Sequence, residues 1–123
     1  MSDVDLLAAP DTIAVSRAVD AYAAILRNRY GASLKGIYLF GSRARGDFDP
    51  YSDVDVAIVL DDSAERPSET KSLSELAYDI FLQTGAEIQP WIFQEAEWRT
   101  PEHSPSAGLI RAARRDSRPV TPP

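Results

Sequence analysis

The 123-residue sequence contains no cysteine. This absence excludes disulfide bonds, thiolate metal sites and cysteine nucleophiles. The sequence also lacks an apolar run long enough to cross a bilayer, and its N-terminus lacks the charged-then-apolar pattern of a signal peptide. We therefore expect a cytoplasmic protein that has no membrane partner.

Basic residues are outnumbered by acidic ones. There are 13 lysines and arginines against 19 aspartates and glutamates, which gives a formal net charge of -6 and an isoelectric point near 4.7. Proteins that grip duplex nucleic acid through its phosphates usually carry a basic face. No duplex nucleic acid partner is therefore expected. The bulk charge does not exclude a single nucleotide that is screened by a metal ion.

The length suits one domain, and an apolar share of 44% is enough for one modest core. Residues 1–10 are expected to form a flexible N-terminus. Residues 11–116 form the folded domain. Residues 117–123 hold three of the nine prolines and are expected to form a flexible tail.

Hydrophobic periodicity and turn signals predict alternating helices and strands. The first helix starts at a cap, Asp11 or Thr12, and stops at Gly31. The other predicted elements are a strand at 37–40, a strand at 54–60, a loop at 61–68, a helix ending at Gly85, a strand at 87–93 and a helix at 107–115. Pro90 places the third strand at a sheet edge or marks a bulge. The expected class is α/β (α+β), a small mixed β-sheet with helices packed on it.

A glycine-serine turn directly follows the first predicted strand. Gly41 lets backbone N–H groups approach an anion, and Ser42 adds a hydroxyl. Arg43 and Arg45 add permanent positive charge. These features indicate a phosphate-binding loop, although a plain strand-ending turn with surface arginines has the same sequence.

Two aspartates lie at the start of the second predicted strand. Asp53 and Asp55 are two residues apart, so their side chains point to the same face. Carboxylates this close repel, and desolvation in an apolar strand adds to the cost. A hard divalent cation, Mg²⁺ or Mn²⁺, relieves both effects. The alternative is that Asp53 caps a turn while Asp55 pairs with Arg43 or Arg45.

These residues carry a family resemblance. The segment Gly41-Ser42-Arg43-Ala44-Arg45-Gly46, followed by Ser52-Asp53-Val54-Asp55, resembles the signature of the minimal nucleotidyltransferases (MNT) in the DNA polymerase beta superfamily. The resemblance implies a polymerase-beta-like nucleotidyltransferase fold over most of residues 11–115. Many standalone bacterial and archaeal members are encoded beside a HEPN-domain partner, as antitoxin and toxin.

The resemblance also implies a chemistry. Members transfer a nucleoside monophosphate from a triphosphate, here ATP or another NTP, to a hydroxyl. Gly41 and Ser42 would hold the terminal phosphates, and Arg43 or Arg45 would neutralise their charge. Asp53 and Asp55 would bind Mg²⁺ or Mn²⁺.

Active members usually carry a third carboxylate on the third strand. Either Glu87 or Gln89 occupies that position here, and we assign it to Glu87, which the resemblance then implies to be the third metal ligand and the catalytic carboxylate that takes the acceptor's proton. The resulting hypothesis is AMP transfer from ATP to a hydroxyl of a HEPN-type partner. The alternative is a catalytically idle antitoxin that neutralises its partner by binding. Transfer to a small molecule is less favoured, because such relatives carry an added helical domain.

Two tryptophans bear on the predicted site. Trp91 in the third strand and Trp98 in the turn that follows could each stack on a nucleobase. Aromatic residues in such positions more often belong to the core or to a partner contact.

Overall fold

The computed structural model describes residues 7–62 and 66–122. The helices are α1 (Thr12–Tyr30), α2 (Ser42–Arg45), α3 (Arg66–Thr84), α4 (Glu95–Arg99) and α5 (Ala107–Asp116). The strands are β1 (Leu34–Phe40), β2 (Val54–Leu60), β3 (Ile88–Gln94) and β4 (Arg118–Pro119). Two short 3₁₀ turns, Gly31–Ser33 and Pro101–His103, complete the described elements.

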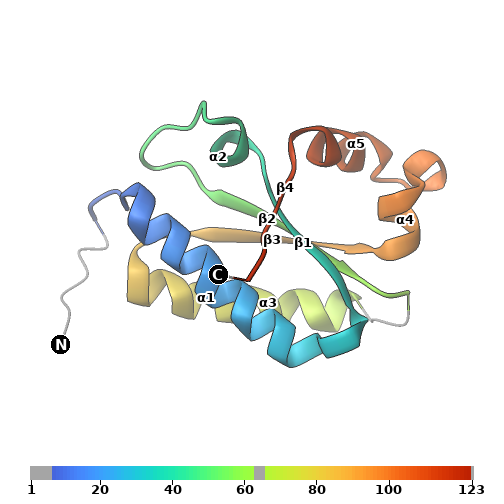
Figure 1. Ribbon diagram of the computed structural model, residues 1–123, viewed down its shortest axis with the longest axis horizontal. Helices are drawn as coiled ribbons and strands as arrows, with labels where there is room; N and C mark the ends of the chain where they lie inside the picture. The colour runs from blue at the N-terminus through green and yellow to red at the C-terminus, as the bar shows by residue number, and fades with distance from the viewer. Residues whose placement is uncertain (1–6, 63–65, 123) are drawn as a thin grey trace.

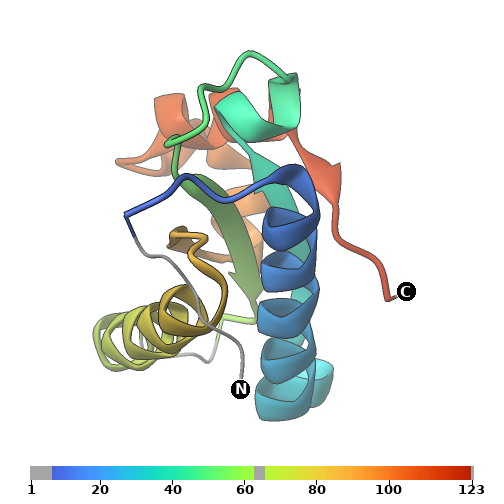
Figure 2. The same cartoon turned by 90° about the vertical axis from the view of Figure 1, so that its left-hand side faces the viewer.

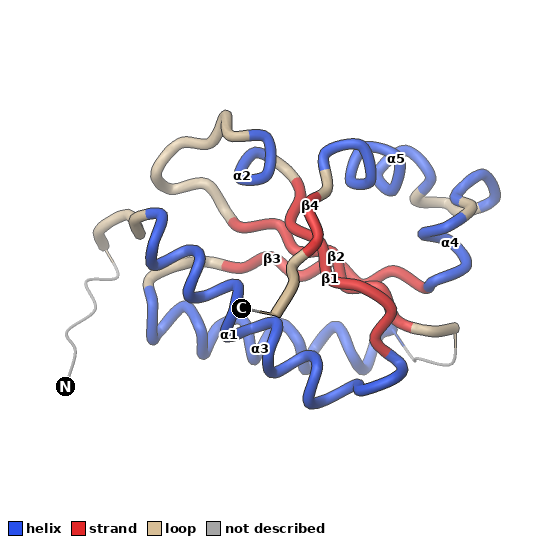
Figure 3. The backbone as a smooth tube through the Cα atoms, viewed as in Figure 1, coloured by secondary structure: helices blue, strands red, loops and turns tan. Residues whose placement is uncertain are grey.

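The strands form one mixed sheet in the order β3-β2-β1-β4 (Figure 3). The central strand β2 runs parallel to β3 and antiparallel to β1, while β4 runs antiparallel to β1. The predicted mixed sheet with packed helices is therefore confirmed. Pro90 lies in β3, which is an edge strand of this sheet, as its position predicted.

Helices cover both faces of the sheet (Figure 1, Figure 2). α1 and α3 lie together on one face, where they pack on alternate β2 side chains from Val54 to Leu60. On the other face, α4 and α5 pack on Ala57 and Val59. This alternation directs Asp55 to the α4–α5 side of the sheet.

The first helix begins and ends as its sequence predicts. The Asp11 carboxylate accepts a hydrogen bond of 2.8 Å from the Ala14 backbone N–H and caps α1. Gly31, with φ at 52°, ends the helix. Inside α1, the buried Tyr22 hydroxyl donates to the Leu73 carbonyl at 2.9 Å and so fixes α1 against α3.

Two elements begin earlier than expected. β1 begins at Leu34 rather than at residue 37, and α3 begins at Arg66, inside the segment expected to be a loop. Pro67 stands in the first turn of α3, where its missing N–H costs no helical hydrogen bond. Residues 63–65 of the expected loop and residues 1–6 of the expected N-terminal tail lie outside the described residues.

The C-terminal segment is paired, where a flexible tail was expected. Arg118 and Pro119 form β4 against β1, and the Val120 N–H donates to the Ile37 carbonyl at 2.8 Å. The Arg27 guanidinium in turn donates to the Val120 carbonyl at 2.9 Å. Within the described residues, no helix combines the length and apolar character needed to cross a membrane.

Candidate active site

Gly41 forms the sharp turn between β1 and α2. Its backbone angles, φ 75° and ψ -160°, belong to a region that is essentially restricted to glycine. Its carbonyl accepts from the N–H groups of Ala44 and Arg45, both at 3.1 Å, which closes the single turn of α2. The half-buried Ser42 follows at the start of α2, where the first N–H groups of a helix have no intrahelical acceptor. The turn therefore offers backbone donors beside a hydroxyl, as a phosphate-binding loop needs.

The Asp55 carboxylate lies directly over Gly41. A Cβ atom on Gly41 would overlap with Asp55 Oδ2, so only glycine lets the carboxylate take this position. The other oxygen, Oδ1, accepts a hydrogen bond of 3.1 Å from Trp91 Nε1. The glycine turn on β1 and the indole on β3 thus hold the carboxylate on β2 from both sides.

Electrostatics in this position oppose the charged form of Asp55. Burial raises the pKa of the Asp55 carboxyl, and the nearby charge of Asp53 raises it further. The hydrogen bond from Trp91 and the charge of Arg45 act in the opposite direction, but the pKa remains above its usual value. A cation between the two carboxylates would remove this cost.

Arg43 has a structural role that its sequence position did not reveal. Its side chain is only 9% exposed, and its guanidinium donates to the carbonyls of Ser52 and Pro50 at 3.1–3.2 Å. The guanidinium also lies over the Phe48 ring, 4.4 Å from its centroid. Arg43 therefore ties the glycine turn to the loop that delivers Asp53.

Arg45 is exposed and pairs with other acids. Its guanidinium contacts Asp47 at 3.1 Å and Asp116, at the end of α5, at 3.2 Å. The pairing of Asp55 with Arg43 or Arg45, weighed above as an alternative, is not what the structure contains, because Asp55 contacts Trp91 instead. Asp49, rather than Asp53, caps the loop by accepting from the Tyr51 N–H at 2.8 Å.

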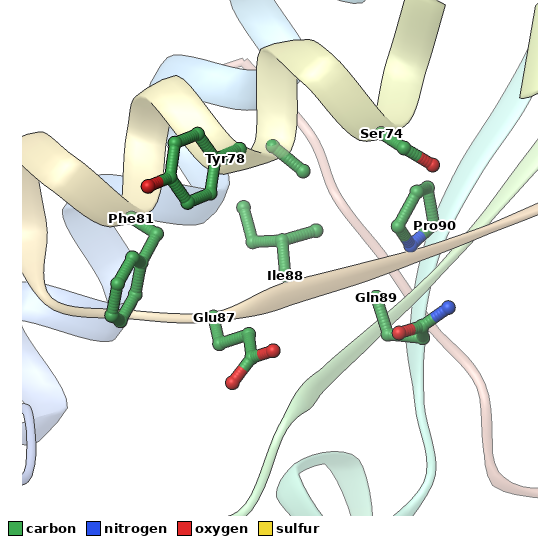
Figure 4. A pocket seen from close by; sticks show the side chains of 8 residues that line it. Ser74, Tyr78, Phe81, Glu87, Ile88, Gln89 and Pro90 are labelled. Carbon is green, nitrogen blue, oxygen red and sulfur yellow. The ribbon is translucent and has the colours of Figure 1, made fainter. Parts of the chain in front are cut away.

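The strand register decides what stands beside the aspartates. Asp55 on β2 pairs with Gln89 on β3, whereas Glu87 precedes β3 and accepts from the Val54 N–H at 2.9 Å through its carbonyl. Figure 4 shows the side chains of Glu87 and Gln89 on the same side of the strand. Among residues 7–62 and 66–122, no group of three or more His, Cys, Asp or Glu side chains is arranged to hold a metal ion.

The residues present nevertheless suit a hard divalent cation. Asp53 is exposed and directly precedes β2, Asp55 is half-buried beside the glycine turn, and the charge of Asp53 acts on Asp55. Carboxylate oxygens are preferred ligands of Mg²⁺, which commonly takes one or two carboxylates and completes its shell with phosphates and water. Asp53 and Asp55 would therefore hold the ion together with a bound triphosphate.

Trp91 is the site residue that the sequence left undecided. It lies half-buried on the site face, meets the Phe40 ring edge-on at 6.3 Å, and donates to Asp55. Its need for a hydrogen-bond acceptor was a usable signal, because a buried indole N–H usually finds one. Trp98, by contrast, is buried in the core and stacks on Tyr38 at 5.2 Å.

Comparisons with known proteins bear on the family and the fold of the chain. The family model described as "Nucleotidyltransferase domain" matches residues 19–112. A relative from Methanocaldococcus jannaschii, named "Putative protein adenylyltransferase MJ0604", is 28% identical over 82 residues, which cover 67% of this chain and 82% of the relative.

Two solved structures share the fold. One is described as a putative nucleotidyltransferase from Sulfolobus solfataricus and aligns with a TM-score of 0.54 at 19% identity, covering 87% of this chain and 79% of that one. The other belongs to a toxin-antitoxin crystallised with AMP-PNP and aligns with a TM-score of 0.57 at 19% identity, covering 85% and 73%. At this identity the likeness concerns the fold.

Proposed function

Because the chain belongs to the nucleotidyltransferase domain family, we propose that it transfers a nucleoside monophosphate, AMP from ATP, to a hydroxyl group of a partner protein. The observation that carries the proposal is the convergence of the Gly41 turn and the Asp53–Asp55 pair. The Gly41 turn suits a phosphate and the Asp53–Asp55 pair suits a cation. A metal-bound triphosphate contains both groups.

The reaction is a displacement at the α-phosphorus. The acceptor oxygen forms a bond to that phosphorus, the bond to the bridging oxygen breaks, and pyrophosphate leaves. The hydroxyl proton passes to a base, for which we propose Glu87. Divalent metal, when bound, neutralises charge on the transferring phosphate and on the leaving group.

The residues of this chain position the reactants. Gly41 and Ser42 hold the terminal phosphates, while Asp53 and Asp55 hold Mg²⁺ or Mn²⁺. Arg45 is exposed beside the turn and lowers the negative potential there, whereas Arg43 acts by fixing the loop. Such chemistry depends mainly on positioning and electrostatics.

A protein acceptor of HEPN toxin type fits the small size of the domain. Within the described residues the fold is one sheet with its covering helices, and no separate helical unit there encloses a small acceptor. Two comparisons support a protein acceptor: one relative is named as a protein adenylyltransferase, and one similar fold belongs to a toxin-antitoxin with AMP-PNP.

The test is incubation of the protein with labelled ATP, Mg²⁺ and a panel of HEPN-domain proteins. We expect a mass increase of one AMP on an acceptor hydroxyl and none with the Asp53→Asn/Asp55→Asn variant. A folded sample that transfers no label with any of the common nucleoside triphosphates, in Mg²⁺ or Mn²⁺, contradicts the proposal.

A second candidate function follows from the register of β3. Gln89, a neutral amide, stands opposite Asp55, and Glu87 lies outside the strand. If Glu87 does not serve as third acid, the fold neutralises its partner by contact alone. Co-expression with the partner separates the two cases, because neutralisation by contact survives the change of both aspartates to alanine.

A further inference from the structure

A groove runs between α3 and the edge strand β3. It has a volume of about 260 Å³, and its apolar lining comes from Ala77, Tyr78, Phe81, Ile88 and Pro90. Figure 4 shows Tyr78 and Phe81 on α3 beside Ile88 on β3. Small-molecule sites usually enclose roughly 300–1,000 Å³. This groove is smaller, so it suits one anchoring side chain of a peptide rather than a nucleotide.

The rim of the groove is mainly acidic. Glu75 and Asp79 line the adjoining surface of α3, and Glu87 borders the groove itself. Among the described side chains, Lys71 is the single basic residue lining these two hollows, so the three carboxylates outnumber it. Tyr78 stands among them with 60% of its surface exposed. An apolar floor with an acidic rim favours a segment that carries an apolar or aromatic anchor and flanking basic residues.

Glu87 joins this groove to the candidate active site. The same residue lines a second hollow, together with Tyr51 and Ser52. Ser52 directly precedes Asp53, so this second hollow is lined by the chain neighbour of the first aspartate. A segment lying in the groove would therefore bring a neighbouring hydroxyl to the side of the site where Glu87 stands.

A second copy of this chain is a poor occupant. In a two-fold symmetric contact the same patch faces itself, and the acidic rims would repel. Addition of a β-strand is also disfavoured. The Glu87 carbonyl points to β2, so the alternation of the backbone turns Pro90 towards the free edge. Proline offers no N–H there to an added strand.

We propose that the α3–β3 groove docks the acceptor segment of the partner protein, a basic segment whose apolar anchor rests on Tyr78 and whose hydroxyl reaches the site past Glu87. The proposal deepens the transfer function and rests on it. It names the chemistry of the substrate as a positively charged, hydroxyl-bearing stretch of polypeptide.

Binding is measured without nucleotide, so that the result does not depend on catalysis. The probes are two fluorescently labelled random copolymers, one of lysine and tyrosine and one of glutamate and tyrosine. We expect the lysine copolymer to bind and the glutamate copolymer not to bind. Asp79→Lys and Tyr78→Ala should each weaken binding about tenfold, the change expected when a central charge or anchor is lost.

Matched controls lie outside the groove. Glu102→Lys reverses an exposed charge near α4, and Leu109→Ala removes an exposed apolar side chain on α5. Both controls should bind the lysine copolymer as the unmodified chain does. Thermal melting of each variant checks that it is folded.

Three results overturn the proposal. These are equal binding of both copolymers, unchanged binding in both groove variants, and a dimer that dissociates on Tyr78→Ala. The last result would show that a second copy of this chain occupies the groove. If the lysine copolymer binds as expected but no HEPN-domain protein of the panel receives AMP in the presence of ATP and Mg²⁺, the docking site stands and the transfer function fails.

Discussion

At the scale of single residues, the site depends on contacts that converge on Asp55. Gly41 leaves room for one of its oxygens, and Trp91 donates to the other. Neither contact is a full charge, so the carboxylate remains costly to ionise and its pKa is raised. The ionised Asp55 carboxylate is therefore unfavourable in this position by itself and favourable when a cation lies beside it.

Replacing Gly41 by alanine should damage both the fold and the site. The change forces a Cβ atom into Asp55 and an L-residue into a backbone region reserved for glycine. We expect a loss of about 1–3 kcal/mol in the free energy of unfolding, measured by urea denaturation. Gly108→Ala is the control, because a Cβ there meets nothing within 4 Å and the position lies in α5. It should be neutral or stabilising, and an equal loss in both variants would refute this account.

Replacing Asp55 by asparagine should stabilise the metal-free protein at neutral pH. Asparagine keeps an oxygen that can accept from Trp91 but carries no charge. Because the folded-state pKa of Asp55 is raised, the native state binds the proton more tightly than the unfolded chain does. The contribution of Asp55 to stability therefore falls as pH rises from the usual aspartate range through the raised pKa.

Denaturation of both proteins across acidic and neutral pH, in the presence of a chelator, measures this difference. The gap in stability between Asp55→Asn and the unmodified chain should widen over that window and then stay level. A variant that is less stable than the unmodified chain at neutral pH would show that the raised pKa does not govern the balance.

At the scale of elements, the C-terminal segment completes the sheet. β4 covers the edge of β1 that faces away from β2, and Val120 continues the contact through Ile37 and Arg27. An uncovered strand edge presents unpaired backbone groups and invites association with other chains. The short pairing thus protects the strand that leads into Gly41.

Val120→Pro tests the value of this contact. Proline removes the N–H that donates to Ile37, and we expect a loss of about 1 kcal/mol in the free energy of unfolding. Hydrogen exchange should become faster in β1. Thr121→Pro also adds a proline to the segment but leaves the Val120 N–H in place, so it should change little. Similar exchange rates in β1 for both variants would argue against a stabilising β4.

At the scale of the whole molecule, ligand binding and stability are linked. The net charge of -6 and the Asp53–Asp55 pair weaken the binding of a free anion and favour the binding of a cation. A nucleotide is expected to bind only with its metal.

Mg²⁺ and ATP together should therefore raise the melting temperature of the unmodified chain. At a ligand concentration of 100 times the Kd, the stabilisation is about 2.7 kcal/mol. ATP in a chelator should give little shift, as should Mg²⁺ and ATP with Asp53→Asn/Asp55→Asn. An equal shift with and without Mg²⁺ would place the nucleotide elsewhere on the protein.

The sequence predicted the central elements better than the peripheral ones. β2 was predicted at its observed bounds, because Asp55 alone interrupts its apolar run and Asp53 directly precedes its first residue. β4 escaped prediction because Arg118 and Pro119 carry no apolar pattern and gain their strand geometry only from β1. The bounds of α2 could not be predicted, since four residues are too few to show helical periodicity.

The features of the candidate site also differ in how well the sequence predicts them. Local spacing predicts that Asp53 and Asp55 share a face, and in the structure the two lie close enough for the charge of Asp53 to raise the pKa of Asp55. The Trp91–Asp55 hydrogen bond depends on the register between two strands that α3 separates in the chain, and local pattern does not carry that register. The part played by Arg43 depends on a loop conformation and was equally hidden.

The buried guanidinium of Arg43 also bears on kinetics. It donates to the carbonyls of Pro50 and Ser52, so protein groups alone hold the shape of the stretch that leads to Asp53. Nucleotide binding then needs no disorder-to-order transition of this stretch, so the entropy cost of ordering it on binding is small. Association should consequently follow simple single-step kinetics, with a rate set by encounter rather than by loop closure.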